Sequence, residues 1–142
     1  MGSLERRELH HPTMRQPKGA FVHALEVPTE GRVVYVSGLT AQNQDGEIVG
    51  VDDMARQAEV VFEQMARLLE VAGGGFDDVV KLTVYTRDMD RWEEVTEERR
   101  RRFTGRLPTA TMVEVSRFVH PEALLEVEAV AQLGTVESTP PL

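Results

Sequence analysis

The sequence predicts an α+β fold in which two helices cover one face of a mixed β-sheet. The 142 residues are about the length of one ordinary domain, so a single hydrophobic core is expected. Strand and helix periodicities follow one another in the order ββαβαββ, and each helix joins two strands as a crossover. Because such crossovers are right-handed, both helices are expected on the same face of the sheet.

The chain divides into an arm, one domain and a tail. Residues 1–18 mix charges and show neither helical nor strand periodicity, which predicts a flexible N-terminal arm. Residues 19–133 carry all the periodic segments and form the single predicted domain. Residues 134–142 are expected to be a flexible C-terminal tail.

The first half of the domain begins with two predicted strands. Residues 21–27 and 32–37 are rich in β-branched and aromatic residues and flank a turn signal at 28–31, which predicts an antiparallel pair. A second turn at 45–46 precedes a possible short strand at 47–49. An amphipathic helix follows, capped by Asp52 or Asp53 and ended by the glycines at 73–75.

The second half repeats the pattern. Residues 78–86 alternate as a strand, with Val80 among the residues toward the core. The second helix is expected to start at Asp90, to use Glu93 in a capping box, and to bury Trp92 and Phe103. Strands are expected at 110–117 and 123–133. The sheet face opposite the helices combines polar and apolar residues, so other subunits are expected to cover it.

Composition excludes several classes of chemistry. The chain has 24 acidic and 16 basic residues, a net charge of −8 that disfavours nucleic acid as a partner. Without cysteine there is no disulfide, no thiolate zinc site and no cysteine nucleophile. The N-terminus has no apolar core of signal-peptide type and no run of 18 apolar residues occurs, so a cytoplasmic protein without membrane partners is expected.

Four segments, in order and spacing, carry a resemblance to a known family: VVYVSGL, GGGFDDVVKLTVYTRDMDRW, PTATMVEVSRF and LLEVEAVA. Together they resemble the Rid family, the reactive intermediate deaminases also called the YjgF family, over residues 19–133. The resemblance implies a chorismate-mutase-like fold and a homotrimer with ligand clefts between adjacent subunits.

The resemblance also implies site residues, some retained and some replaced. Glu126 matches the glutamate thought to position the attacking water, and Ser37 and Gly38 match the serine and glycine after the second strand. Ala110 stands where the deaminases have the arginine that grips the substrate carboxylate. Phe21 replaces a tyrosine and Thr96 replaces an asparagine. Alanine supplies neither the charge nor the orientation of a bidentate arginine.

Three further residues have both a functional and a structural interpretation. Thr111 gives the cleft a hydroxyl group beside Ala110, which favours a neutral or less anionic ligand; ordinary strand propensity explains it equally. His23 could act as a base or donor, but a buried, hydrogen-bonded histidine is more usual. Glu126 and Glu128 share one strand face, where the pair could act as acid and base or be two solvated or salt-bridged acids; Glu128 is expected to be structural.

Two charged clusters are interpreted as structural. The arginines at 99–102 follow several glutamates on one helix, which predicts solvated or intersubunit salt bridges. His10 and His11 are adjacent ligands in an arm and do not define a metal site. No metal and no cofactor is assigned.

The predicted function is that of a small-molecule enzyme of the Rid fold, acting on an imine-like, enamine-like or related C–N bond through Glu126. It is not expected to be a standard 2-imino-acid deaminase, because the arginine is missing. The alternative is a non-catalytic trimer that binds a metabolite or partner protein in the same cleft. Ribonuclease activity is opposed by the negative charge and the lack of a clear catalytic histidine pair. The expected partners are a small molecule and further copies of the chain.

Overall fold

The computed structural model describes residues 5–135. The ends of the predicted arm and tail, residues 1–4 and 136–142, lie outside this range. The elements are, in chain order, β1 (Arg7–Leu9), β2 (Ala24–Glu26), β3 (Arg32–Leu39), α1 (Met54–Val71), η1 (Phe76–Asp78), β4 (Val79–Thr86), η2 (Met89–Arg91), α2 (Trp92–Arg102), β5 (Thr109–Glu114) and β6 (Leu125–Leu133).

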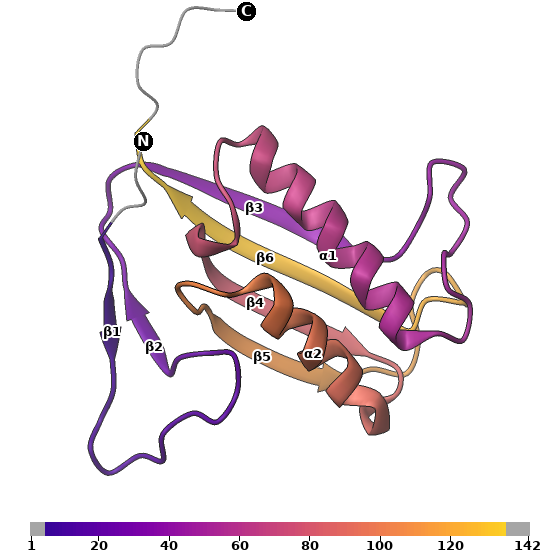
Figure 1. Ribbon diagram of the computed structural model, residues 1–142, viewed down its shortest axis with the longest axis horizontal. Helices are drawn as coiled ribbons and strands as arrows, with labels where there is room; N and C mark the ends of the chain where they lie inside the picture. Colours follow the sequence, from indigo (N-terminus) through magenta and orange to yellow (C-terminus); the bar gives the residue numbers. More distant parts are fainter. Residues whose placement is uncertain (1–4, 136–142) are drawn as a thin grey trace, which may run out of the picture.

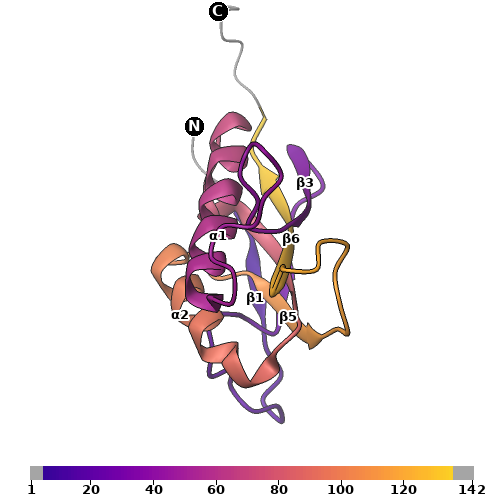
Figure 2. The same cartoon turned by 90° about the vertical axis from the view of Figure 1, so that its right-hand side faces the viewer.

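The main sheet has four strands in the order β3-β6-β4-β5. Strands β4 and β5 run parallel, whereas β6 is antiparallel to both β3 and β4, so the sheet is mixed. Both helices lie on the same face of this sheet, and no helix or strand of residues 5–135 covers the other face (Figures 1 and 2). The predicted fold class is confirmed, while the trimer remains a prediction.

Helix α1 begins and ends where its sequence signals predict. Asp53 is the N-cap, and its carboxylate accepts a hydrogen bond from the Arg56 backbone N–H at 3.0 Å. The helix buries Phe62, Met65 and other apolar side chains against the sheet. Gly73, just after its end, has a φ of 90°, a left-handed conformation that glycine adopts at low cost.

The start of helix α2 differs from the prediction. The 3₁₀ turn η2 comes first, and Asp88 rather than Asp90 caps it by accepting from the Asp90 backbone N–H at 3.2 Å. Arg91 is the N-cap of α2 and makes no side-chain capping bond, so the predicted capping box is wrong. Trp92 lies 44% exposed instead of in the core, because the inserted turn moves it to the first helical position.

The N-terminal region also differs from the prediction. Residues 7–9, expected in a flexible arm, form β1, which pairs with β2 in a separate two-stranded ribbon (Figure 1). The predicted hairpin between 21–27 and 32–37 is therefore wrong, since β3 pairs with β6. The Arg6 guanidinium donates to the carbonyl oxygens of Val79 and Leu107 at 3.0 and 3.4 Å. These long-range bonds join the ribbon to the domain and leave no local pattern in the sequence.

Two smaller corrections concern strands. A bulge between Val79 and Lys81 places Val79 at the core position, and Val80 is only partly buried. The short strand at 47–49 is reduced to one bridge, between Gln42 and Ile48. Neither change moves the outer face of β4, where Lys81, Thr83 and Tyr85 alternate as predicted.

Candidate functional site

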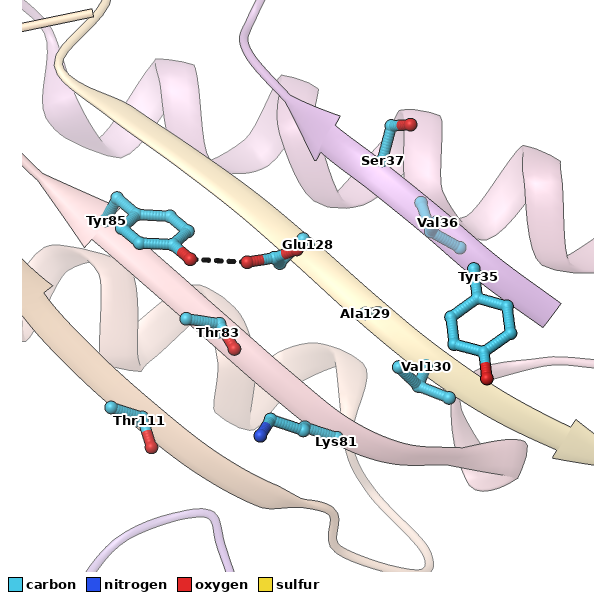
Figure 3. Close-up of a pocket in the computed structure, with 10 residues that line it drawn as sticks. All are labelled: Tyr35, Val36, Ser37, Lys81, Thr83, Tyr85, Thr111, Glu128, Ala129 and Val130. Atoms are coloured by element: carbon cyan, nitrogen blue, oxygen red, sulfur yellow. Dashed lines mark hydrogen bonds between the residues drawn. The ribbon is translucent and has the colours of Figure 1, made fainter. Parts of the chain in front are cut away.

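The sheet face opposite the helices carries an open hollow of about 680 Å³ (Figure 3). Four strands contribute side chains to it, so its shape follows from the strand order rather than from one loop. Ser37 lines it from β3, and Thr111 lines it from β5. The other side chains around it are mainly polar or aromatic: Tyr35, Lys81, Thr83, Tyr85 and Glu128.

Glu126 and Gly38 are in direct contact across β3 and β6. A side chain at position 38 would place its Cβ atom 2.5 Å from the Glu126 Oε2 atom, so the carboxylate in its present position packs against the glycine. The pairing of β3 with β6 shifts register between Val36 and Leu39, which brings the Ser37–Gly38 segment into this position. Glu126 points away from the helices, because Leu125 and Val127 on either side of it are buried in the core.

Glu128 has a hydrogen-bond partner that sequence reasoning missed. The Tyr85 hydroxyl donates to its carboxylate at 2.5 Å (Figure 3). This hydrogen bond raises the pKa of Tyr85, since ionising the phenol would lose the bond, and desolvation and the charges of Glu128 and Glu126 add to the effect. Tyr85 lies opposite Glu126 in the β4–β6 register. Glu128 is thus held in place, whereas Glu126 is not among the residues that line the first hollow.

A second hollow lies at the β5 edge of the molecule. Its lining includes four of the predicted substrate-binding residues together with Lys81: Phe21, His23, Ala110 and Thr111. Ala110 pairs with Leu82 and packs against the core on the helix side, whereas Thr111 pairs with Thr83 and faces the first hollow. Ala110 and Thr111 therefore point to opposite faces of the sheet at its edge strand, β5.

A third hollow lies between helix α2 and residues 15–23. It contains Thr96, the remaining predicted substrate-binding residue, and again Phe21 and His23. Trp92 and Arg99 complete it from α2, and neither was expected there from sequence. Amphipathic periodicity assigned Trp92 to the core, and Arg99 was grouped with the salt-bridged arginines.

The predicted site residues therefore fall into two groups within one chain. Glu126, Ser37 and Gly38 form the first, while Phe21, His23, Thr96 and Ala110 form the second. Thr111 lines both the first and the second hollow. Glu126 is opposite Tyr85 and Ala110 is opposite Leu82, with one strand between them. Strand spacing then puts their Cα atoms about 14 Å apart. One chain alone does not bring the two groups around a small ligand.

His23 is neither buried nor isolated. Its ring stacks on that of His10 with centroids 5.1 Å apart, and the two Nδ1 atoms are 3.1 Å apart. In this contact one imidazole donates and the other accepts. The histidine of the predicted arm thus holds the predicted ligand-binding histidine. Within residues 5–135, no cluster of three or more histidine or acidic side chains could hold a metal ion.

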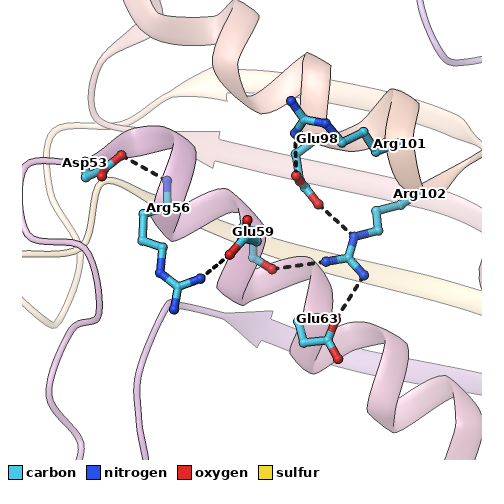
Figure 4. A network of polar contacts seen from close by, with 7 residues as sticks. All are labelled: Asp53, Arg56, Glu59, Glu63, Glu98, Arg101 and Arg102. Atoms are coloured by element: carbon cyan, nitrogen blue, oxygen red, sulfur yellow. Dashed lines mark hydrogen bonds and ion pairs between the residues drawn. The ribbon is translucent and has the colours of Figure 1, made fainter.

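The arginines at 99–102 are not equivalent. Arg101 and Arg102 bond to the buried carboxylate of Glu98, each at 2.7 Å, and Arg102 reaches across to Glu63 on α1 at 3.1 Å (Figure 4). Arg100 pairs with Glu97 at 3.0 Å. These three form the salt bridges that the sequence predicted. Arg99 does not, since its guanidinium turns inward and donates to the carbonyl oxygen of Ala20 at 3.2 Å.

Fold and site together define a small α+β protein of the YjgF type, with two helices on one face of a mixed sheet. The model of the family described as Endoribonuclease L-PSP matches residues 13–133. The chain therefore belongs to this family, which the sequence segments identified as the Rid or YjgF family. No helix in the described part of the chain is long and apolar enough to cross a membrane.

Relatives cover nearly the same region. A RutC family protein of Pyrococcus abyssi is 34% identical over 117 residues, which are 82% of this chain and 88% of the relative. The RutC family protein UK114 of Drosophila melanogaster is 31% identical over 97% of each chain. Among solved structures, the Rid family protein YyfB of Yersinia pestis, itself of unknown function, superposes with a TM-score of 0.81 at 29% identity. The match covers 90% of this chain and 98% of YyfB.

Proposed function

We propose that the protein is a small-molecule enzyme that hydrolyses or deaminates an imine, enamine or related C–N bond, or moves a proton at such a bond, in a cleft between subunits. In the hydrolytic case Glu126 takes a proton from a water molecule while the water oxygen bonds to the imine carbon. Return of that proton to nitrogen, with transfer of the second water proton, releases ammonia and leaves a carbonyl group. Ser37 donates a hydrogen bond to the substrate.

The contact between Glu126 and Gly38 carries this proposal. A Cβ atom at position 38 would displace the Glu126 carboxylate from the position it has here. The contact holds the Glu126 carboxylate against the backbone of β3, next to the exposed Ser37. A base positioned in this way needs no large side-chain rearrangement during the reaction.

The split of the site residues supports a cleft completed by a second subunit. Glu126 faces outward on the uncovered sheet face, where Tyr35 is 79% and Val33 52% exposed. Burying such a face against other copies removes apolar surface from water. A homotrimer would bring Glu126 of one copy toward the Phe21 and Ala110 group of the next.

Two other functions are tested by the same protein preparation. A non-catalytic ligand-binding trimer is favoured by the replacements at Ala110, Phe21 and Thr96, and predicts binding without turnover. RNA cleavage is suggested by the description of the matching family, Endoribonuclease L-PSP. The net charge of −8 opposes it, and RNA that survives incubation with the protein would exclude it.

The deciding experiment replaces Glu126 with glutamine, which keeps the shape but removes the base. We expect Glu126→Gln to lower kcat for imine hydrolysis by about two to four orders of magnitude, with unchanged melting temperature. Glu122→Gln is the matched control, because Glu122 is an exposed glutamate in the turn before β6. Equal kcat in the Glu126 variant would contradict the proposal and direct attention to Ser37 or His23.

A further inference from the structure

The third hollow collects positive charge in a chain that is strongly negative overall. Four cationic side chains line it: Arg15, Lys18, Arg99 and Arg100. No aspartate or glutamate is among the described residues that line it, although the chain has 24 acidic residues. Only Arg100 has an ion-pair partner, Glu97, in the structure's described range. The local charge is therefore opposite in sign to that of the whole protein.

Arg99 is the most constrained of these cations. The residue is only 6% exposed, and the single hydrogen bond of its side chain among residues 5–135 runs from Nη2 to the Ala20 carbonyl oxygen. Its Nε atom is buried without any hydrogen-bond partner in that range. Burial lowers the pKa of Arg99, and the neighbouring charge of Arg100 lowers it further. A buried guanidinium without an anion is unfavourable, so an anion bound here would stabilise it.

The remaining walls of the hollow are apolar. Trp92 and Phe21 contribute aromatic surface, and Met112 lines it from β5. Trp92 is 44% exposed at the first position of α2, beside the hollow rather than in the core. A ligand held by Arg99 would place its body against these side chains, where apolar surface gains from leaving water.

We propose that Arg99 is the anion-binding residue of this hollow, and that its ligand is a small organic anion with an apolar body. The inference rests on the proposed function in one respect, since Phe21, His23 and Thr96 belong to the same predicted site. It deepens that function by naming the substrate class. The carboxylate is held from helix α2 and not from strand β5.

The position of Arg99 fits a carboxylate-binding role in place of the arginine missing at position 110. It lies three residues after Thr96, one helical turn along, so both residues face the same hollow. Ala110, where the deaminases have their arginine, lines the adjacent hollow, and the two hollows share Phe21 and His23. Helix α2 thus supplies a guanidinium, that of Arg99, where β5 lacks one. Arg99 lies in the third hollow, next to the second hollow that Ala110 lines. Small imino acids would be held in a different orientation, whereas longer apolar anions would reach both hollows.

Ligand binding in this hollow can be followed by the fluorescence of a residue in its wall. Trp92 is the only tryptophan and lines the hollow, so its fluorescence reports binding there. Benzoate is the probe, and benzamide is the neutral molecule of the same shape. We expect benzoate to give a saturable change in Trp92 fluorescence and to bind at least about tenfold more tightly than benzamide. Arg99→Gln should weaken benzoate binding by about tenfold or more, and Arg101→Gln on the same helix should leave it unchanged.

A second measurement keeps the test independent of variant folding. The Arg99 Nε–H resonance, assigned by its loss in Arg99→Lys, should shift on addition of benzoate to the wild type and not on addition of benzamide. Equal benzoate binding by wild type and Arg99→Gln, or no shift of this resonance, would overturn the inference. A third result would also overturn the inference: the wild type does not bind benzoate, and Arg99→Gln no longer forms oligomers. Arg99 would then pair with an acidic residue of a neighbouring copy.

The proposed function and this inference fail separately. Glu126→Gln should bind benzoate like the wild type, because Glu126 is not among the residues that line the hollow. Loss of turnover with intact benzoate binding in Glu126→Gln supports both. Benzoate binding that depends on Arg99, together with full activity in Glu126→Gln, would overturn the proposed base and leave the anion site standing.

Discussion

Two arginines of helix α2, one turn apart, lie in opposite electrostatic environments. At Arg102 the guanidinium bonds to Glu98 and Glu63 and bridges α1 to α2 (Figure 4). At Arg99 the guanidinium is more deeply buried and has no carboxylate among the described residues. Removing one partner of the Arg102 ion pairs would leave a buried carboxylate less well paired, whereas removing the Arg99 guanidinium would leave no carboxylate without its partner.

The first prediction exploits this difference and has the largest effect on the fold. Arg102→Met should lower the free energy of unfolding by about 2–3 kcal/mol, because it leaves the buried Glu98 carboxylate with Arg101 alone. Arg99→Met removes an unneutralised charge and should change stability by less than about 1 kcal/mol. Urea unfolding followed by circular dichroism measures both. Equal losses in the two variants would break the comparison.

The second prediction concerns the glycine under Glu126. Gly38→Ala should lower kcat by about tenfold to a hundredfold, because the new Cβ atom displaces the carboxylate from its position. Gly75→Ala is the control, since its added Cβ meets nothing within 4 Å and its φ of −159° suits any residue. Steady-state kinetics on the same imine substrate compare the two. If both variants were equally active, the position of Glu126 would not matter for catalysis.

The third prediction tests the missing arginine of β5. Wild-type protein should turn over 2-aminoacrylate poorly, because Ala110 offers no charge-assisted contact, worth about 1.5–3 kcal/mol. Ala110→Arg should raise kcat/KM by up to about one to two orders of magnitude, with Phe21 and Thr96 limiting the gain. Ala110→Gln controls for side-chain size. The substrate is generated in the assay and its decay is followed; rapid turnover by the wild type would show that another cation, such as Arg99 or Arg117, already suffices.

The smallest predicted effect is a pH dependence at Tyr85. Its pKa is raised above the ordinary value of 10.0, first through the hydrogen bond to Glu128. A group with a raised folded-state pKa stabilises the fold below its unfolded pKa, and this stability is lost as pH rises through the folded pKa. The melting temperature should therefore fall more steeply above pH 10 in the wild type than in Tyr85→Phe. Parallel curves for the two proteins would refute the link between Tyr85 and Glu128.

Local signals in the sequence were sufficient for much of the fold. The Asp53 cap, the apolar face of α1 and the glycines after it act within a few residues, so the helix could be predicted almost to its ends. The β1–β2 ribbon could not, because its pairing joins residues 15 to 19 positions apart, such as Leu9 with Ala24 and Arg7 with Glu26, in segments without periodicity. Trp92 was misplaced because a 3₁₀ turn, set by Asp88, shifts the helix start.

The site was predictable to a different degree. The resemblance placed Glu126, Ser37 and Gly38 together, and the structure brings Glu126 and Gly38 into contact. Arg99 was not distinguishable from its three neighbours, because its burial depends on a segment 79 residues earlier in the chain whose carbonyl group it binds. Sequence shows the charge of a residue, but only the folded chain shows whether another part of it supplies the counterion.

The proposed function requires a site shared between copies of the chain, and the molecular mass in solution tests this requirement directly. Light scattering on the purified protein at micromolar concentration should give about three times the chain mass of 15.9 kDa. Such a trimer allows Glu126 of one copy to meet the Ala110 hollow of another. A stable monomer would leave the two groups about 14 Å apart and would contradict the account.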